Sequence, residues 1–262
     1  MTTFLCQRIP GVENFEFQGG YMANFILREQ DGDVTTITLN RPEIGNRVSD
    51  PMASELAEML DDAAKEARLI LFRGAGEEFC LGREAMGKRP PHLEAYEVRG
   101  QIEVIFNCYD AFRRSKVPVV GVVQGRAAGF GCALAALCDV TIAGDKARFQ
   151  LPEMAHNIMP TIAMSALIDR VPRKALMHLV YSTAELDAQR ALAIGLVSHV
   201  VSANQLDSAV RQFVEELKKK PRPALMAVKE YAKFAYNMDT PAANDFAWNL
   251  HATINSSSAM RP

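Results

Sequence analysis

The chain has 262 residues, of which 48% are hydrophobic, and this is enough apolar material for one large domain or for a core with an appendage. The formal net charge of −2 gives no basic field that would attract nucleic acid. The longest apolar runs are too short to span a bilayer, and the first residues lack the apolar core of a signal peptide. Length, composition and charge therefore predict a cytoplasmic protein that binds neither nucleic acid nor membranes.

Cysteine and histidine usage indicates neither a disulfide framework nor a metal site. The five cysteines are scattered and show no paired spacing: Cys6, Cys80, Cys108, Cys132 and Cys138. An odd, scattered set is typical of reduced thiols inside a cell. No cluster of Cys and His has the spacing of a zinc site, so we expect no metal.

Strands and helices alternate between residues 34 and 143. Short apolar segments predict strands at residues 34–39, 69–72, 117–123 and 140–143. Ser49-Asp50-Pro51 offers an N-cap and a first-turn proline for a helix that ends near residue 65. A run of small residues predicts another helix at 130–137. This alternation is typical of parallel strands joined by helical crossovers.

A further helix is indicated by apolar residues spaced alternately four and three apart: Val98, Ile102, Ile105, Tyr109 and Phe112. Such a stripe predicts packing against the core. After about residue 160 the chain reads as helices. One of them has an apolar face made by Leu206, Val210, Phe213 and Leu217, and Pro221 and Pro241 mark the starts of two more.

Two glycine-centred segments each follow a predicted strand. One is Phe79-Cys80-Leu81-Gly82-Arg83-Glu84, and the other spans residues 122–134 and contains Gly125, Gly129 and Gly131. Glycine lets the backbone turn tightly and approach a ligand closely. Two backbone N–H groups from separate turns could then converge on one oxygen, which would make an oxyanion hole for a carbonyl that develops negative charge.

These segments occur in order with three others, Leu39-Asn40-Arg41-Pro42-Glu43, Phe149-Gln150-Leu151-Pro152-Glu153 and Ala193-Ile194-Gly195-Leu196-Val197. The ordered set resembles the crotonase superfamily, also called the enoyl-CoA hydratase/isomerase family, from about residue 22 to the late 250s. The resemblance implies an α/β fold, with a crotonase-like ββα spiral core at 22–200 and a C-terminal helical trimerisation region at 201–262. Residues 1–21 would be an N-terminal extension, and the assembly would be a homotrimer or a hexamer.

The same resemblance implies an acyl-CoA thioester as substrate, with coenzyme A as part of that substrate and no separate cofactor. The oxyanion donors would be the backbone N–H groups of Arg83 and Phe130. Phe130 stands where the family usually has another glycine, and its larger side chain would narrow or reshape the acyl pocket. Glu153 would be the catalytic carboxylate.

One catalytic carboxylate of the family is absent. Classical family hydratases use two glutamates around one water, and the position of the first is occupied by Ala133. A methyl group cannot move a proton, so the sequence favours proton transfer by a single glutamate, as in family isomerases, over hydration. His156 is a possible second acid/base group, and a structural histidine is the alternative.

The resemblance also places the coenzyme A moiety of the substrate. The residues expected to contact it, through backbone groups and apolar walls, are Glu43, Ile44, Leu81, Gly82, Arg83, Ala85 and Gly129.

Two other functions stay open at this point. Phe130, Ala133 and His156 differ from the residues usual in the family at these positions. C–C bond hydrolysis, decarboxylation and thioester hydrolysis in the same site are therefore alternatives. A non-catalytic acyl-CoA-binding homologue is the other alternative, against which Glu153 and both oxyanion turns argue.

Overall fold

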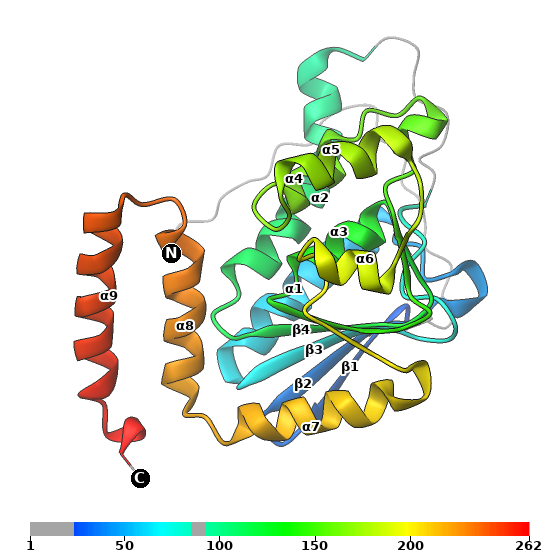
Figure 1. The fold of residues 1–262 in the computed structure, drawn as a ribbon. Coiled ribbons are helices and arrows are strands. Elements are labelled where there is room, and N and C mark those ends of the chain that lie inside the picture. The colour runs from blue at the N-terminus through cyan, green and yellow to red at the C-terminus, as the bar shows by residue number, and fades with distance from the viewer. Residues whose placement is uncertain (1–23, 85–92, 262) are drawn as a thin grey trace, which may run out of the picture.

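The computed structural model describes residues 24–84 and 93–261, and a six-stranded sheet lies at its centre (Figure 1). The strands are β1 (Ile26–Asp31), β2 (Val34–Leu39), β3 (Leu69–Gly74), β4 (Val119–Val123), β6 (Val140–Gly144) and β9 (His199–Val201), in the spatial order β1-β2-β3-β4-β6-β9. β1 and β2 pair antiparallel as a hairpin, and every other neighbouring pair is parallel. The predicted parallel pairing is therefore confirmed.

A second, smaller sheet consists of β5 (Arg126–Ala128), β7 (Arg148–Gln150) and β8 (Leu186–Asp187). Its strands have only two or three residues, which is too short for an alternating pattern to be recognised in the sequence. β8 and β9 also show that the expectation of helices alone after residue 160 is wrong. Both strands complete sheets that earlier segments begin.

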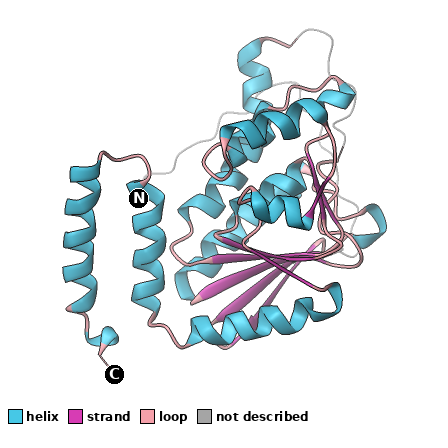
Figure 2. Cartoon of the chain, in the orientation of Figure 1, coloured by secondary structure: helices cyan, strands magenta, loops and turns pink. Residues whose placement is uncertain are grey.

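Six helices cover one face of the large sheet: α1 (Asp50–Glu66), α2 (Ala95–Arg114), α3 (Phe130–Leu137), α4 (Thr161–Leu167), α5 (Arg173–Ser182) and α6 (Ala188–Ala193) (Figures 1 and 2). α7 (Leu206–Lys218) covers the other face, where Leu206, Val210 and Val214 pack against the strands. The central strands are therefore buried on both sides, as their near-continuous apolar sequences indicate. The short 3-10 helices are η1 (Pro42–Ile44), η2 (Glu153–His156), η3 (Ala203–Gln205) and η4 (Ser258–Met260).

Local sequence explains where the predicted helices begin. The Ser49 side chain accepts a hydrogen bond from the Met52 N–H, and a proline lies in the first turn of α1. α3 starts at Phe130 directly after Gly129, whose φ of 51° lies in the left-handed region that favours glycine. Both helices have the starts that the sequence predicts.

The last two helices, α8 (Arg222–Ala235) and α9 (Thr240–Asn255), lie side by side and project away from the sheet (Figure 1). We call residues 222–255 the C-terminal arm. α9 has no buried residue, and Lys229 is the one buried residue of α8. The predicted extension, residues 1–21, lies outside the described residues, and the predicted boundary at residue 200 stays a prediction.

Cationic side chains hold the arm to the core. The Lys229 ammonium donates to the Phe112 and Val117 carbonyls, both at 3.1 Å, and to Asp139 Oδ2 at 2.7 Å. The Arg222 guanidinium donates to carbonyls at the end of α1, including that of Ala67 at 2.9 Å. A carbonyl at the C-terminal end of a helix carries the negative end of the helix dipole, which favours such partners.

We expect Lys229→Met to lower the free energy of unfolding by about 2–3 kcal/mol, because it leaves the Asp139 carboxylate without its buried cation. Asp139 keeps its bond from the Val119 N–H, so the loss should be smaller than for a fully buried pair. Urea unfolding measures the change. The matched control, Lys218→Met, removes an exposed pair with Glu215 and should change stability little. An unaltered unfolding midpoint in Lys229→Met would contradict this account of how the arm is held.

Candidate active site

The two glycine-centred segments leave the carboxyl ends of neighbouring parallel strands, β3 and β4, and lie against each other. The Cys80 N–H donates to the Arg126 carbonyl at 3.1 Å, and the Ala128 N–H donates to the Cys80 carbonyl at 2.9 Å. A Cβ atom on Gly131 would lie 2.1 Å from that carbonyl oxygen, so only glycine fits there. The close approach expected from the glycines is therefore present.

Both segments include a backbone N–H, that of Arg83 and that of Phe130, without a protein acceptor in the part of the chain that the structure describes. The Gly82 carbonyl accepts from the Val48 N–H, and the Glu84 N–H donates to the Val48 carbonyl, both at 3.0 Å, so the intervening Arg83 N–H stays unpaired. The Phe130 N–H is unpaired because Phe130 is the first residue of α3. Both residues line the same cavity, of about 600 Å³.

The side chains of residues 83 and 84 fix this turn in place. The Arg83 guanidinium pairs with Asp50 at 2.5 Å, and Glu84 pairs with Arg41. Both ion pairs join the turn to the segment around the start of α1. The Arg83 guanidinium therefore has an ion-pair partner of its own, apart from the backbone N–H.

The cavity brings together most of the residues that the sequence singled out. Its wall includes Leu81, Gly82, Arg83, Gly129, Phe130, Glu153 and His156. Glu43 and Ile44 lie in η1 and do not line the cavity, although the Leu81 N–H donates to the carbonyl of Gly45, the residue that follows η1. Ala85 lies outside the described residues.

Glu153 begins η2, and its carboxylate lies against the start of α3. A Cβ atom on Gly129 would lie 3.1 Å from Glu153 Oε1. Glu153 Oε2 is buried and has no hydrogen-bond partner among the described residues. Burial raises the pKa of the Glu153 carboxyl above its ordinary value, and the residue's own N–H and the charge of the exposed His156 partly oppose this. A carboxylate with a raised pKa is a stronger base once it is ionised.

An aromatic pair lies where α2 meets α3. The rings of Tyr109 and Phe130 stack with centroids 5.5 Å apart and planes 20° apart. Both residues line the cavity, whereas Ala133, one turn further along α3, is fully buried and does not. Tyr109 belongs to the apolar stripe expected to pack in the core. Helical spacing predicts which face is buried, and it gives no sign that the core opens into a cavity at this point.

Arginines around the cavity were also missed by the sequence prediction. Arg47, Arg126 and Arg148 all line it, and Arg126 and Arg148 are opposite each other on the parallel strands β5 and β7. Glu78 pairs with Arg126 at 2.7 Å. Arg126 follows Gly125 within the second glycine-centred segment. This position is the one feature of the sequence that could have indicated an arginine at the cavity.

The enoyl-CoA hydratase/isomerase family model matches residues 29–261, most of the chain. The chain belongs to this family. Its α/β architecture is the crotonase fold that the sequence motifs predict. The solved enoyl-CoA hydratase from Mycobacterium smegmatis has a TM-score of 0.84 at 26% identity, covering 89% of this chain and 92% of that one. A putative enoyl-CoA hydratase from Thermobifida fusca, solved in complex with CoA, has a TM-score of 0.78 at 26% identity, covering 87% and 92%.

Relatives in the family have different activities. The 1,2-epoxyphenylacetyl-CoA isomerase of Escherichia coli (strain K12) is 30% identical over 80% of this chain and 82% of that protein. The enoyl-CoA hydratase domain-containing protein 3, mitochondrial, of Rattus norvegicus is 29% identical over 72% of this chain. The aligned part spans 63% of the rat protein, which is less than two thirds of its length. Family membership thus leaves the choice between hydratase and isomerase open.

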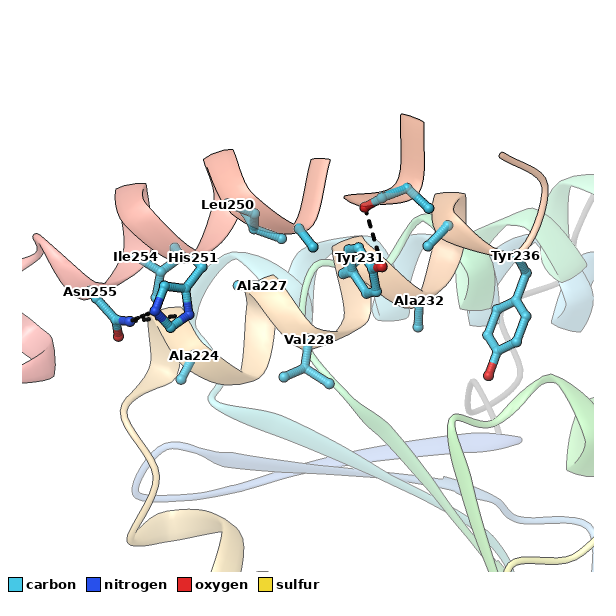
Figure 3. Close-up of a pocket in the computed structure, with 13 residues that line it drawn as sticks. Ala224, Ala227, Val228, Tyr231, Ala232, Tyr236, Leu250, His251, Ile254 and Asn255 are labelled. Atoms are coloured by element: carbon cyan, nitrogen blue, oxygen red, sulfur yellow. Dashed lines mark hydrogen bonds between the residues drawn. The ribbon is translucent and has the colours of Figure 1, made fainter. Parts of the chain in front are cut away.

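A second cavity, of about 650 Å³, lies between α8 and α9 of this family member (Figure 3). Ala227, Val228 and Leu250 contribute to its apolar wall, and His251 and Asn255 hydrogen-bond at one end. No residue of its lining carries a carboxylate.

Residues 24–84 and 93–261 contain neither a candidate metal cluster nor a membrane-spanning helix. No group of three or more His, Cys, Asp or Glu side chains there could hold a metal ion. Similarly, no helix of this described part is long and apolar enough to cross a membrane.

Proposed function

We propose that this member of the enoyl-CoA hydratase/isomerase family is an isomerase-type enzyme that moves a proton along an acyl-CoA thioester with a single carboxylate. The observation that carries the proposal is the position of Glu153. Its buried carboxylate lies against Gly129, directly before the unpaired Phe130 N–H. A base and an oxyanion donor beside one cavity are what enolate chemistry requires.

The two unpaired N–H groups would stabilise the enolate. When a proton leaves the carbon chain, its bonding electrons move toward the thioester carbonyl, whose oxygen becomes negatively charged. The N–H groups of Arg83 and Phe130 would both donate to this oxygen. Phe130 is the first residue of α3, so the positive end of the helix dipole adds to the stabilisation. One such donor is worth about 2.7–4 kcal/mol of transition-state stabilisation.

Glu153 would carry the proton in both directions. The ionised carboxylate takes a proton from one carbon of the acyl chain and becomes neutral while the enolate forms. It then returns the proton to another carbon, the enolate electrons make the new C–H bond, and the double bond has moved. Net atoms and charge are unchanged, so no cofactor is needed beyond the coenzyme A of the substrate.

Hydration is the less suitable reaction for this site. Adding water needs one group to deprotonate the water while a proton is delivered to carbon. Position 133 supplies no carboxylate, and Tyr109 and Phe130, whose rings stack, line the cavity. His156 lines the cavity but is exposed to solvent, so it lies at the rim of the cavity.

The remaining parts of the proposal concern the coenzyme A moiety, the assembly and the location. Arg47, Arg126 and Arg148 offer guanidinium groups that could bind the phosphates of coenzyme A.

The C-terminal arm, with Val228, Tyr236 and Trp248 each at least 70% exposed, would form the contacts of a homotrimer or a hexamer. We keep the cytoplasm as the expected location, although the rat relative is named as mitochondrial.

A deuterium experiment tests the proposed reaction. The protein is incubated in D₂O with enoyl-, hydroxyacyl- and oxoacyl-CoA thioesters, and the products are followed by mass spectrometry. We expect solvent deuterium on carbon, a shifted double bond in an enoyl-CoA, and little hydration of crotonyl-CoA. The Glu153→Gln variant should form the exchanged and isomerised products about 10²–10⁴ times more slowly.

Other outcomes would overturn the proposal. Hydration of crotonyl-CoA at ordinary enzyme rates would show that one carboxylate suffices for water addition here. Release of free CoA or loss of a carbon fragment would identify a thioesterase, a C–C hydrolase or a decarboxylase. Binding of thioesters with no exchange and no product would identify a non-catalytic homologue.

A further inference from the structure

Tyr109 is a polar residue at the cavity that the proposed proton transfer does not use. It lies on α2 and is 1% exposed, yet it lines the cavity together with Phe130 and Glu153. Its ring is held on two sides, stacked on Phe130 and edge-on to Phe106 at 6.4 Å. The orientation of the hydroxyl is therefore fixed by packing.

The Tyr109 hydroxyl has no hydrogen-bond partner among the described residues, although its oxygen is buried. Buried polar groups in folded proteins nearly always have a partner, and an unpaired one calls for a physical explanation. A structural tyrosine in an apolar core could be phenylalanine at no cost. A hydroxyl beside a ligand cavity instead gains its partner when the ligand binds.

The chemistry of this hydroxyl is that of a donor. Burial raises the pKa of Tyr109 well above its ordinary value, and the charges of Cys108 and Glu153 act in the same direction. The group therefore stays a neutral O–H at physiological pH and can donate to an oxygen. Tyr109 and Glu153 line the same cavity, so both can act on one bound acyl group.

We infer that Tyr109 is a specificity-determining residue whose hydroxyl donates a hydrogen bond to an oxygen on the acyl chain, beyond the thioester carbonyl. The preferred substrates are then acyl-CoA thioesters with a hydroxyl, oxo or epoxide oxygen on that chain. A hydrocarbon acyl chain packed against the buried Tyr109 hydroxyl would leave that hydroxyl unpaired, and this disfavours its binding. The inference rests on the proposed acyl-CoA function.

Binding measurements test the inference without any turnover. Isothermal titration compares butyryl-CoA with three probes of the same chain length that carry one more oxygen: acetoacetyl-CoA, 3-hydroxybutyryl-CoA and 4-hydroxybutyryl-CoA. We expect at least one of these to bind tighter than butyryl-CoA, on the order of tenfold to a hundredfold. Tyr109→Phe keeps the ring stack and should remove this preference, in part because butyryl-CoA binds tighter once no hydroxyl is left unpaired.

Tyr181→Phe is the matched control, because Tyr181 is 67% exposed and does not line the cavity. It should keep the full preference. Equal binding of all four thioesters, or a preference that survives in Tyr109→Phe, would overturn the inference and leave the acyl-CoA function intact. If Tyr109→Phe changed only the pH dependence of proton transfer, Tyr109 would be a partner of Glu153, which also overturns the inference. If neither coenzyme A nor any thioester bound, the proposed function itself would be wrong.

Discussion

Glu153→Gln should lower the turnover rate of the true substrate by a factor of about 10²–10⁴, which is the rate enhancement that a general acid/base group usually provides. The amide keeps the size of the side chain and cannot take up the proton. In the wild-type protein, the rate should rise with pH as Glu153 ionises, through a pKa that burial holds above the ordinary value. Steady-state kinetics across pH measure both effects, and titration with a substrate analogue should show coenzyme A binding largely intact.

The stability of the same variant provides an independent control. A carboxyl whose pKa is raised in the folded state stabilises the fold at low pH, and this contribution is lost as pH rises through the folded-state pKa. At pH 7 the ionised Glu153 is thus unfavourable to folding, and Glu153→Gln should not lower the melting temperature. Unchanged turnover in a folded variant would refute the assignment of Glu153 as the base.

Arg83→Pro should reduce kcat by about 10²–10³, because proline has no N–H and removes one of the two oxyanion donors. The hydrogen bonds that hold this turn use the Gly82 carbonyl and the Glu84 N–H, so proline at position 83 removes none of them. The measurement is single-turnover kinetics on the substrate that the deuterium experiment identifies.

Arg83→Ala separates the backbone from the side chain. It loses the ion pair with Asp50 and keeps the N–H. Its kcat should therefore stay within about tenfold of wild type, since that pair is partly exposed. If the alanine variant were as impaired as a folded proline variant, the guanidinium would be the essential group, and the backbone assignment would fail.

Most helices and strands could be predicted from the sequence, because the patterns that indicate them involve residues close together in the chain. Ser49 and Pro51 define the start of α1, and the apolar run before Gly125 defines β4. The hairpin of β1 and β2 was missed, although Asp31-Gly32 is a known turn signal and Gly32 has a φ of 59°. β1 is mostly exposed and polar, so it carries no apolar pattern.

The parts of the candidate site that are made by backbone groups could be predicted from the sequence. The parts that depend on how two helices pack against each other could not. Glycine motifs indicate close approaches, and Gly129 and Gly131 make them. The role of Tyr109 depends on the crossing of α2 and α3, which no local pattern describes.

The central claim is that two backbone N–H groups and Glu153 act together on one thioester. A crystal structure of Glu153→Gln with a bound enoyl-CoA tests it most directly, because the variant should hold the substrate without converting it. We expect the thioester oxygen at roughly 2.7–3.1 Å from both the Arg83 and the Phe130 nitrogen, with residue 153 beside the acyl carbons. A thioester oxygen that faces another part of the cavity, or a substrate bound between α8 and α9, would contradict it.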